Sequence, residues 1–179
     1  TKPFGFTKFI PGPGYGGHCI PIDPFYLYWL AKKNNINLDF IKTSGIVNRK
    51  ITDWISKKII LFFKKKFLGK KKVKIFILGV SYKPDIDDIR ESPALKIMEK
   101  LKEAGIDIEY SDPYVKKINY NGILKKSKPL NNKNLKKYPI VLIATNHSVF
   151  NYKLIAEKSQ FLFDTRNSIK DRKNNFFKL

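Results

Sequence analysis

The spacing of apolar residues changes character near Gly69. Before it, apolar side chains recur every three or four positions over residues 40–67 while lysines fill the opposite face, which predicts one long helix. A shorter helix is predicted over residues 25–33, because Asp23-Pro24 is a suitable helix start. The preceding stretch, rich in glycine and proline, predicts a shaped loop without regular structure. We place a domain boundary at the lysine-rich break, dividing the chain into residues 1–69 and 70–179.

Short apolar runs alternate with helical patterns after this boundary. Strands are predicted over residues 73–80, 107–110, 139–145 and 160–164, helices over 92–105 and 151–158, and one ragged element within 114–137. Ser92-Pro93 provides an N-cap and a first helical position, and Gly105 a helix end. This alternation predicts an α/β fold, a Rossmann-like parallel sheet with flanking helices on both faces.

Ligands bind such sheets beyond the carboxyl ends of the strands. The polar residues that follow the four predicted strands are Ser81, Tyr82 and Lys83, then Ser111 and Asp112, then Asn146 and His147, and finally Thr165, Arg166 and Asn167. No G-x-G-x-x-G follows any of these strands, so the sheet lacks the usual dinucleotide fingerprint.

Composition narrows the possible partners. The chain has 36 basic and 15 acidic residues among 179, a net charge of +21, which raises nucleic acid as a partner. Only four of the basic residues are arginine, so we interpret the lysine excess as compositional drift and expect no nucleic acid partner. One cysteine and two histidines argue against a metal site, and the single thiol favours a reducing cytoplasm. The apolar runs are too short for membrane insertion.

Candidate chemistry is concentrated in the stretch from Gly14 to Pro24, which reads GYGGHCIPIDP. A lone cysteine is most often a small buried hydrophobe, but Cys19 follows two glycines that can bring bare backbone close to a ligand. Asp23 lies four positions later, where it could cap a helix, orient a water molecule, or do both. His18 could activate the thiol or simply structure the loop.

Residues 11–27 closely resemble the nucleophile loop of the UDP-glucose/GDP-mannose dehydrogenase family, and most of all its UDP-N-acetylglucosamine 6-dehydrogenase branch. A second motif agrees with this: GVSYKPD at residues 79–85, followed by Asp88 and RESPA at 90–94, resembles the start of that family's UDP-binding domain. Asp112-Pro113, residues 145–147 and residues 164–167 match later landmarks in order.

The resemblance implies an NAD-dependent four-electron oxidation of a UDP-sugar C6 alcohol to a carboxylate, in the supply of precursors for surface polysaccharides. Cys19 would form the thiohemiacetal and thioester, and Asp23 would direct the hydrolytic water. The residues implied in substrate binding are Phe9, Gly14, Tyr15, Gly16, Gly17, Tyr82 and Lys83. Arg90 would contact the cofactor NAD.

Departures from the family pattern shape the remaining expectations. Ile22 stands where the UDP-glucose branch commonly has lysine, which favours an N-acetylhexosamine substrate. The family's NAD-binding domain precedes the region present here, so we expect a C-terminal fragment that is inactive alone. A homodimer is expected through the helix at residues 40–67, on a face including Trp54, Ile55, Ile59, Phe62 and Phe63. Alternatives are a catalytically silent UDP-sugar-binding module, a lysine-rich nucleic-acid binder, and a dehydrogenase for UDP-glucose or UDP-N-acetylmannosamine.

Overall fold

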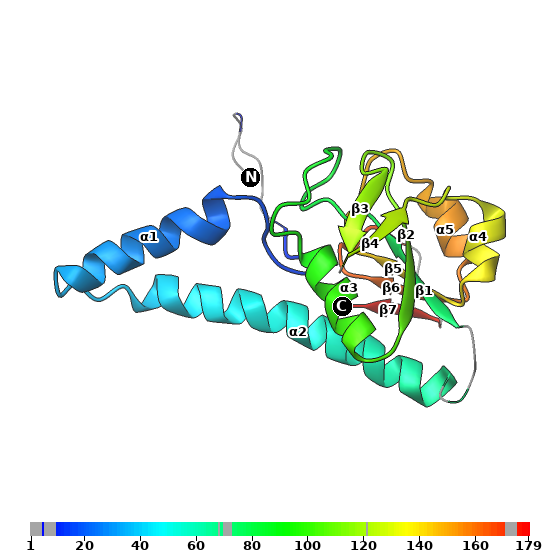
Figure 1. The fold of residues 1–179 in the computed structure, drawn as a ribbon, viewed down its shortest axis with the longest axis horizontal. Helices are drawn as coiled ribbons and strands as arrows, with labels where there is room; N and C mark the ends of the chain where they lie inside the picture. The colour runs from blue at the N-terminus through cyan, green and yellow to red at the C-terminus, as the bar shows by residue number, and fades with distance from the viewer. Residues whose placement is uncertain (1–4, 6–9, 68, 70–72, 121, 171–174) are drawn as a thin grey trace.

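The computed structural model describes residues 5, 10–67, 69, 73–120, 122–170 and 175–179 (Figure 1). In these residues the helices are α1 (Cys19–Lys33), α2 (Asp39–Phe67), α3 (Pro93–Glu103), α4 (Asn132–Lys137) and α5 (Tyr152–Lys158). The strands are β1 (Lys74–Leu78), β2 (Asp107–Ser111), β3 (Lys117–Tyr120), β4 (Ile123–Lys126), β5 (Ile140–Ile143), β6 (Phe161–Asp164) and β7 (Phe176–Lys178).

A five-stranded parallel sheet in the order β2-β1-β5-β6-β7 forms the centre of the fold. The second half of α2 and α3 pack on one face, and α4 and α5 pack on the other. Strands β1 and β5 are fully buried from Ile75 and Ile140 onward, as expected for central parallel strands covered on both faces. The predicted fold class and its four strands are therefore confirmed. The edge strand β7 and the separate antiparallel β3–β4 hairpin were not predicted.

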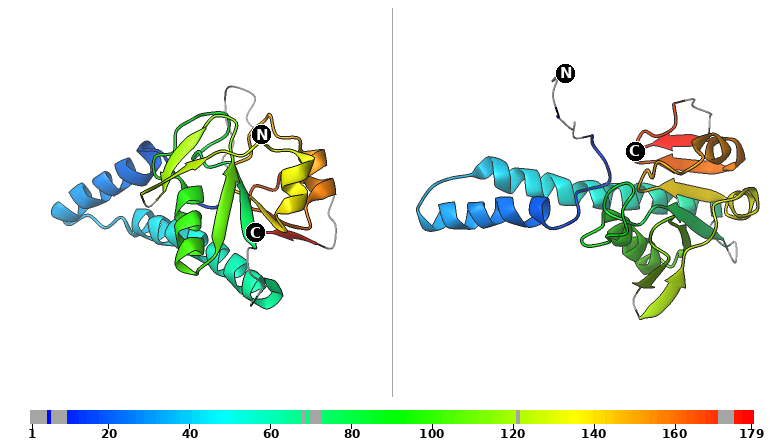
Figure 2. Two further views of the ribbon diagram at one scale, coloured as in Figure 1. Left: turned by 45° about the vertical axis from the view of Figure 1, so that its right-hand side comes forward. Right: turned by 90° about the horizontal axis from the view of Figure 1, so that it is seen from above.

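Helices α1 and α2 form an antiparallel arm that projects from the sheet (Figures 1 and 2). A side chain at Gly45 would meet the Phe25 ring, so the glycine lets the two helices approach closely. The predicted start of α1 at residue 25 is wrong, because the helix begins at Cys19 and contains Pro24. Pro21 falls in the first turn, where amides have no intrahelical acceptor, and Pro24 removes a single hydrogen bond. Asp23 therefore lies inside the helix and does not cap it.

The second half of α2 belongs to the core of the sheet domain. Ile55 and Ile59 are 1% and 0% exposed against this core, and the Phe62 ring packs edge-on against the ring of Phe163 at 5.3 Å. The apolar face assigned from the sequence to a partner subunit is thus largely covered within the chain, although Trp54 remains 45% exposed. The periodicity of the helix was recognised, but periodicity alone does not say which surface covers the apolar face.

Helix α3 starts as predicted, with Ser92 at the N-cap and Pro93 as its first residue. The Ser92 hydroxyl makes no capping bond and is buried without a hydrogen-bond partner. Gly105 follows the helix with a φ of +76°, as a C-terminal glycine should. Within the described residues, no helix is long and apolar enough to cross a membrane.

Candidate functional site

Residues 10–18, here called the glycine loop, are anchored on one side to α2. The Tyr15 amide donates to Asn48 Oδ1 at 3.0 Å, and the Thr52 hydroxyl donates to the Pro13 carbonyl at 2.6 Å. Gly14 has a φ of +143°, and a Cβ there would lie 2.9 Å from Thr52 Oγ1. These contacts bring bare backbone against the helix, which explains the need for glycine at this position.

The other side of the glycine loop packs against residues 81–91, here called the 81–91 segment. The Gly17 amide donates to the Arg90 carbonyl at 2.9 Å. A Cβ on Gly16 would lie 2.5 Å from Tyr82 Cβ, and one on Gly17 would lie 2.9 Å from the Tyr82 ring. The loop motif and the second motif, distant in the sequence, therefore meet in one place. Gly14, Tyr15, Gly16, Gly17 and Tyr82 are brought together, whereas Phe9 lies outside the described residues.

A half-buried cation lies beside the start of the glycine loop. The guanidinium of Arg166, which follows β6, packs directly on Gly12, and Arg166 Nε donates to the Ala144 carbonyl at 2.9 Å. Burial lowers the pKa of Arg166. Among the described residues, the hydrogen-bond acceptor for the Arg166 side chain is the neutral Ala144 carbonyl, so this environment favours an anionic group near the guanidinium.

Cys19 is the first residue of α1 and is exposed. Asp23, also exposed, follows at the i+4 position and therefore shares the same helical face. The structure thus presents thiol and carboxylate to the same region of space, at a helix N-terminus whose dipole favours negative charge.

Arg90 bridges the second motif to this helix N-terminus. Its Nε donates to Asp88 Oδ1 at 2.9 Å, and its Nη1 lies 3.1 Å from His18 Nδ1. Hydrogen bonding to Asp88 raises the pKa of Arg90, with a smaller contribution from Cys19. The same contacts lower the pKa of Asp88 to about 2. His18 therefore accepts from Arg90, which supports a loop-structuring role for this histidine.

Lys83 is exposed, with its ammonium 6.0 Å from the centre of the Tyr82 ring. It follows directly after the ring that covers Gly17, so its side chain starts beside the glycine loop. The segment reverses direction through Asp85 and Glu91, both non-glycine residues with positive φ. Two such residues in one short segment require support from surrounding contacts.

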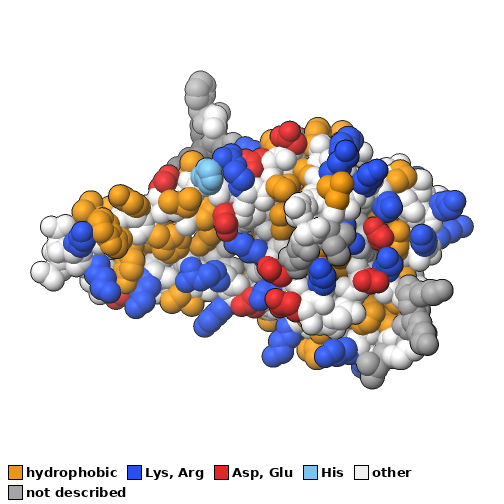
Figure 3. Space-filling view, viewed as in Figure 1, with side chains coloured by type: hydrophobic (Ala, Val, Ile, Leu, Met, Phe, Trp, Pro, Cys, Tyr) orange, Lys and Arg blue, Asp and Glu red, His pale blue; other side chains and the backbone are white. Residues whose placement is uncertain are grey.

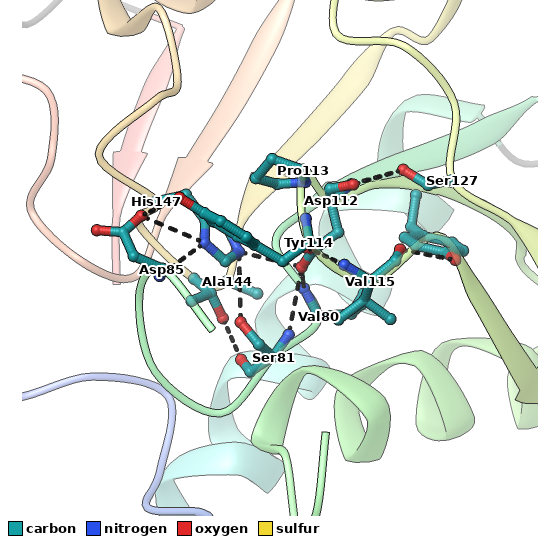
Figure 4. Close-up of polar contacts among 12 residues, drawn as sticks. Val80, Ser81, Asp85, Asp112, Pro113, Tyr114, Val115, Ser127, Ala144 and His147 are labelled. Atoms are coloured by element: carbon teal, nitrogen blue, oxygen red, sulfur yellow. Dashed lines mark hydrogen bonds and ion pairs between the residues drawn. The ribbon is translucent and has the colours of Figure 1, made fainter. Parts of the chain in front are cut away.

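That support comes from a buried polar network at the carboxyl ends of β1, β2 and β5 (Figure 4). His147 Nε2 lies 3.0 Å from Asp112 Oδ2 and 3.3 Å from Ser81 Oγ, and all three residues are at most 4% exposed. The amides of Val80 and Val115 donate to the Asp112 carboxylate at 2.7 and 2.8 Å. Burial raises the pKa of Asp112, but these hydrogen bonds outweigh burial and leave the pKa below its ordinary value.

Sequence reasoning identified the members of this network as strand-end polar residues but did not connect them. The topology joins them, because the carboxyl ends of neighbouring parallel strands meet at one sheet edge. Asn48 and Thr52 of α2 were missed altogether. The signal available for them was the polar interruption of an otherwise apolar helical face.

Two family models match the chain. Residues 76–171 match the UDP-binding domain of the UDP-glucose/GDP-mannose dehydrogenase family, and residues 1–50 match the central domain of the same family. The chain belongs to this family. The resemblance carried by the two motifs is thereby confirmed, and the predicted boundary at Gly69 lies in the interval between the two matches.

Relatives of this family member include enzymes with different named substrates. A UDP-N-acetyl-D-mannosamine dehydrogenase from Methanocaldococcus jannaschii is 33% identical over 167 residues, 88% of this chain and 35% of the relative. A UDP-glucose 6-dehydrogenase from Rhizobium meliloti is 33% identical over 108 residues, 60% of this chain and 24% of the relative. The solved structure of a UDP-D-ManNAc dehydrogenase from Pyrococcus horikoshii has a TM-score of 0.74 and 27% identity, covering 94% of this chain and 38% of that one.

The chain spans about a third of the length of the curated relatives it matches. The part it covers contains both motifs and the five-stranded parallel sheet.

Proposed function

We propose that this chain is the C-terminal part of an NAD-dependent UDP-N-acetylhexosamine 6-dehydrogenase that supplies uronate precursors for surface polysaccharides in the cytoplasm. The observation that carries the proposal is the convergence of an exposed Cys19, the glycine loop and the 81–91 segment at one place. Glycine loops allow backbone amides to approach a diphosphate closely. Arg166 and Lys83 add positive charge on two sides of this loop.

The thiol of Cys19 would act after a first oxidation has produced the C6 aldehyde. An aldehyde has no good hydride to release, but addition of the thiolate to its carbonyl carbon gives a thiohemiacetal that does. Loss of hydride from that carbon yields a thioester on Cys19. The exposure of the thiol at the N-terminus of α1 supports this role, because the covalent adduct needs room for the sugar.

Asp23 would direct the water that hydrolyses the thioester, releasing the carboxylate product and regenerating the thiol. Its place on the same face of α1 as Cys19 supports this assignment. Its carboxylate lies in the exposed part of the helix, where a water molecule can reach it. Proton transfer to a positioned carboxylate is a common contribution to hydrolysis.

When bound, NAD would supply the hydride acceptor, one molecule for each of the two oxidations. The residue of this chain that fits such a cofactor is Arg90, whose exposed guanidinium is held by Asp88 and His18 near Cys19. A fixed, exposed arginine suits a phosphate oxygen. Arg90 would thus hold a phosphate of the dinucleotide.

The sugar is proposed to be an N-acetylhexosamine. Ile22 follows Cys19 on the exposed side of α1, where an apolar side chain favours an acetamido methyl group over a bare hydroxyl. Relatives that include a UDP-N-acetyl-D-mannosamine dehydrogenase make the manno configuration as reasonable as the gluco one. UDP-glucose is the alternative substrate.

A homodimer is proposed through the arm formed by α1 and the first half of α2. Exposed apolar side chains gather on this arm (Figure 3), and they include Tyr26 at 68%, Leu27 at 53% and Phe40 at 88% exposure. Contiguous apolar surface of this kind usually marks an interface. The interface would therefore lie on the arm, away from the buried half of α2.

The proposal is tested with the chain itself, using UDP-N-acetylglucosamine and UDP-N-acetylmannosamine as ligands. Isothermal titration calorimetry should detect binding, and either ligand should protect Cys19 from alkylation, measured by intact-protein mass spectrometry. We expect no reduction of NAD by the chain alone. Binding without any protection of Cys19 would favour the silent UDP-sugar-binding module, and an absence of binding would contradict the proposal.

A further inference from the structure

The 81–91 segment connects the sheet to the glycine loop, and it is held at three points. Its beginning is fixed where the Thr145 hydroxyl donates to the Ser81 carbonyl at 2.6 Å. Its end holds the glycine loop through the bond from Gly17 to the Arg90 carbonyl. Its middle, the turn at Asp85, rests on the chain that follows β5: the Asp85 amide donates to His147 Nδ1 at 3.0 Å, and the Ser148 amide donates to Asp85 Oδ1 at 2.9 Å.

The partners of His147 define its protonation (Figure 4). Nδ1 faces a backbone N–H and must accept, so it carries no proton. Nε2 faces Asp112 Oδ2, an oxygen that already accepts from the Val80 amide. The Asp112 carboxylate is therefore an acceptor, and Nε2 carries the proton. The observed geometry requires the neutral imidazole in this one tautomer.

We propose that His147 is a positioning residue for the UDP-sugar site: its neutral form fixes the Asp85 turn, and through it Tyr82 and Lys83, whereas its protonation releases the turn. The consequence of this role, a loss of UDP-sugar affinity as pH falls, rests on the proposed function. It does not require His147 to touch the ligand, because the ring is fully buried.

Protonation of His147 would place two donors opposite each other. A proton on Nδ1 would point at the Asp85 amide nitrogen, which lies only 3.0 Å away, so the turn would have to move. One such movement would bring the Asp85 carboxylate, now 3.7 Å from Nδ1, into contact with the protonated ring. Because Asp85 adopts a positive φ of 62°, the turn is already a conformation that needs external support. Loss of this acceptor would leave Asp85 held through its carboxylate alone, by the Ser148 amide and the Tyr114 hydroxyl, so the backbone of the turn could relax.

The other titratable groups facing His147 keep their charge state across the neutral range. They are Asp112 and Tyr114 after β2, Asp85 in the segment and Tyr152 of α5, which donates to the His147 carbonyl. Hydrogen bonding to Ser148 lowers the pKa of Asp85, and the hydrogen bonds described above lower that of Asp112. Burial raises the pKa of Tyr114 and takes that of Tyr152 to about 12. Histidine is the side chain that ordinarily changes charge between about pH 5 and 8.

Two amide variants separate the two ring nitrogens. The amide of His147→Asn reaches the position of Nδ1 and can still accept from Asp85, whereas the amide of His147→Gln reaches Nε2 and can still donate to Asp112. With UDP-glucose as probe, calorimetry near pH 7.5 should show affinity close to wild type for His147→Asn and a loss of about fivefold or more for His147→Gln. Equal affinity of His147→Gln and the wild type would overturn the proposal. It would also be overturned if the loss of affinity in the two variants were proportional to their loss of thermal stability.

The pH dependence of the unmutated chain provides the second measurement. Each phosphate of UDP-glucose carries one ester and one anhydride bond and has no second proton to lose near neutrality, so the ligand does not titrate there, and affinity should fall on acidification. His18→Gln, which removes the only other histidine, should retain this fall. A flat profile in the wild-type chain would contradict the role of His147.

Hydrogen exchange distinguishes failure of this inference from failure of the proposed function. Exchange of the Asp85 amide, followed by NMR or by mass spectrometry of peptides from residues 82–90, should accelerate in His147→Gln and at low pH after correction for intrinsic rates. If neither UDP-glucose nor the UDP-N-acetylhexosamines bind, the proposed function fails while this readout still decides the role of His147. Unchanged exchange in His147→Gln would refute that role even if the ligand binds.

Discussion

Replacing Gly17 by alanine should detach the glycine loop from the 81–91 segment. Gly17 has a φ of +79°, and an added Cβ would lie 2.9 Å from two atoms of the Tyr82 ring. The left-handed conformation costs a residue with a side chain about 1–2 kcal/mol. Displacing the ring or breaking the Gly17–Arg90 bond adds about 0.5–1.5 kcal/mol. The docked loop should therefore become less favourable by about 1.5–3.5 kcal/mol, roughly tenfold to several-hundred-fold in population.

Gly105→Ala is the matched control. Gly105 has a similar φ of +76°, but nothing lies within 4 Å of its added Cβ, and it ends α3 outside the proposed site. It should lower the free energy of unfolding by about 1–2 kcal/mol, which for a chain of this size lowers the melting temperature by about 2–4 °C per kcal/mol. Gly17→Ala should change the melting temperature less, because the loop can undock without opening the core.

The assay compares calorimetric affinity for UDP-N-acetylglucosamine with thermal unfolding in the two variants. We expect at least a tenfold loss of affinity in Gly17→Ala and none in Gly105→Ala. If both variants bind as the wild type does, the contact between Gly17 and Tyr82 is irrelevant to the ligand. If both lose affinity in proportion to stability, the effect is global and the assigned site is wrong.

Three further outcomes are expected. With the N-terminal part of a relative supplied and NAD present, Cys19→Ser should abolish carboxylate formation, whereas Asp23→Asn should accumulate a covalent adduct on Cys19, detected by mass spectrometry. Near-normal turnover in Cys19→Ser together with no adduct in Asp23→Asn would contradict the mechanism. Asp112→Asn should lower the free energy of unfolding by about 1.5–3 kcal/mol in denaturant titrations, because the described partners of the carboxylate are all donors; a loss under about 1 kcal/mol would contradict the network. Leu27→Lys should shift a dimer toward monomer in sedimentation, while the similarly exposed Leu124→Lys on β4 should not; an intact dimer in both would exclude the arm.

Local patterns in the sequence predicted most of the fold because burial sets their period. The long helix at residues 40–67 and the strands flanking the site follow from that period. The start of α1 was misplaced because proline was treated as a barrier, although Pro21 occupies a first turn and Pro24 costs one bond. The β3–β4 hairpin had an available signal, the Asn-Gly pair at residues 121–122 between two short runs. Strand β7 is only three residues long and has too little pattern to detect.

The candidate site was predictable only in part, for a different reason. Cys19 and Asp23 lie in one contiguous motif, so local reasoning and resemblance both reach them. The pairing of His147 with Asp112 spans 35 residues and depends on β2 and β5 lying on either side of β1 in the sheet. Sequence rules place both residues at the same sheet edge but do not determine which atoms meet. Contacts of this kind follow from topology, and only the structure supplies them.

Helix α2 explains how the glycine loop keeps its place relative to the sheet. Thr52 holds the Pro13 carbonyl, and one and two turns later Ile55 and Ile59 are buried in the sheet core on the same helical face. A continuous helix transmits position rigidly over such a short distance, so the loop is fixed to the sheet from this side as firmly as the core is packed. The 81–91 segment fixes it from the other side through Arg90. The orientation of Cys19 therefore depends on two supports, one apolar and insensitive to pH, and one polar that includes a histidine.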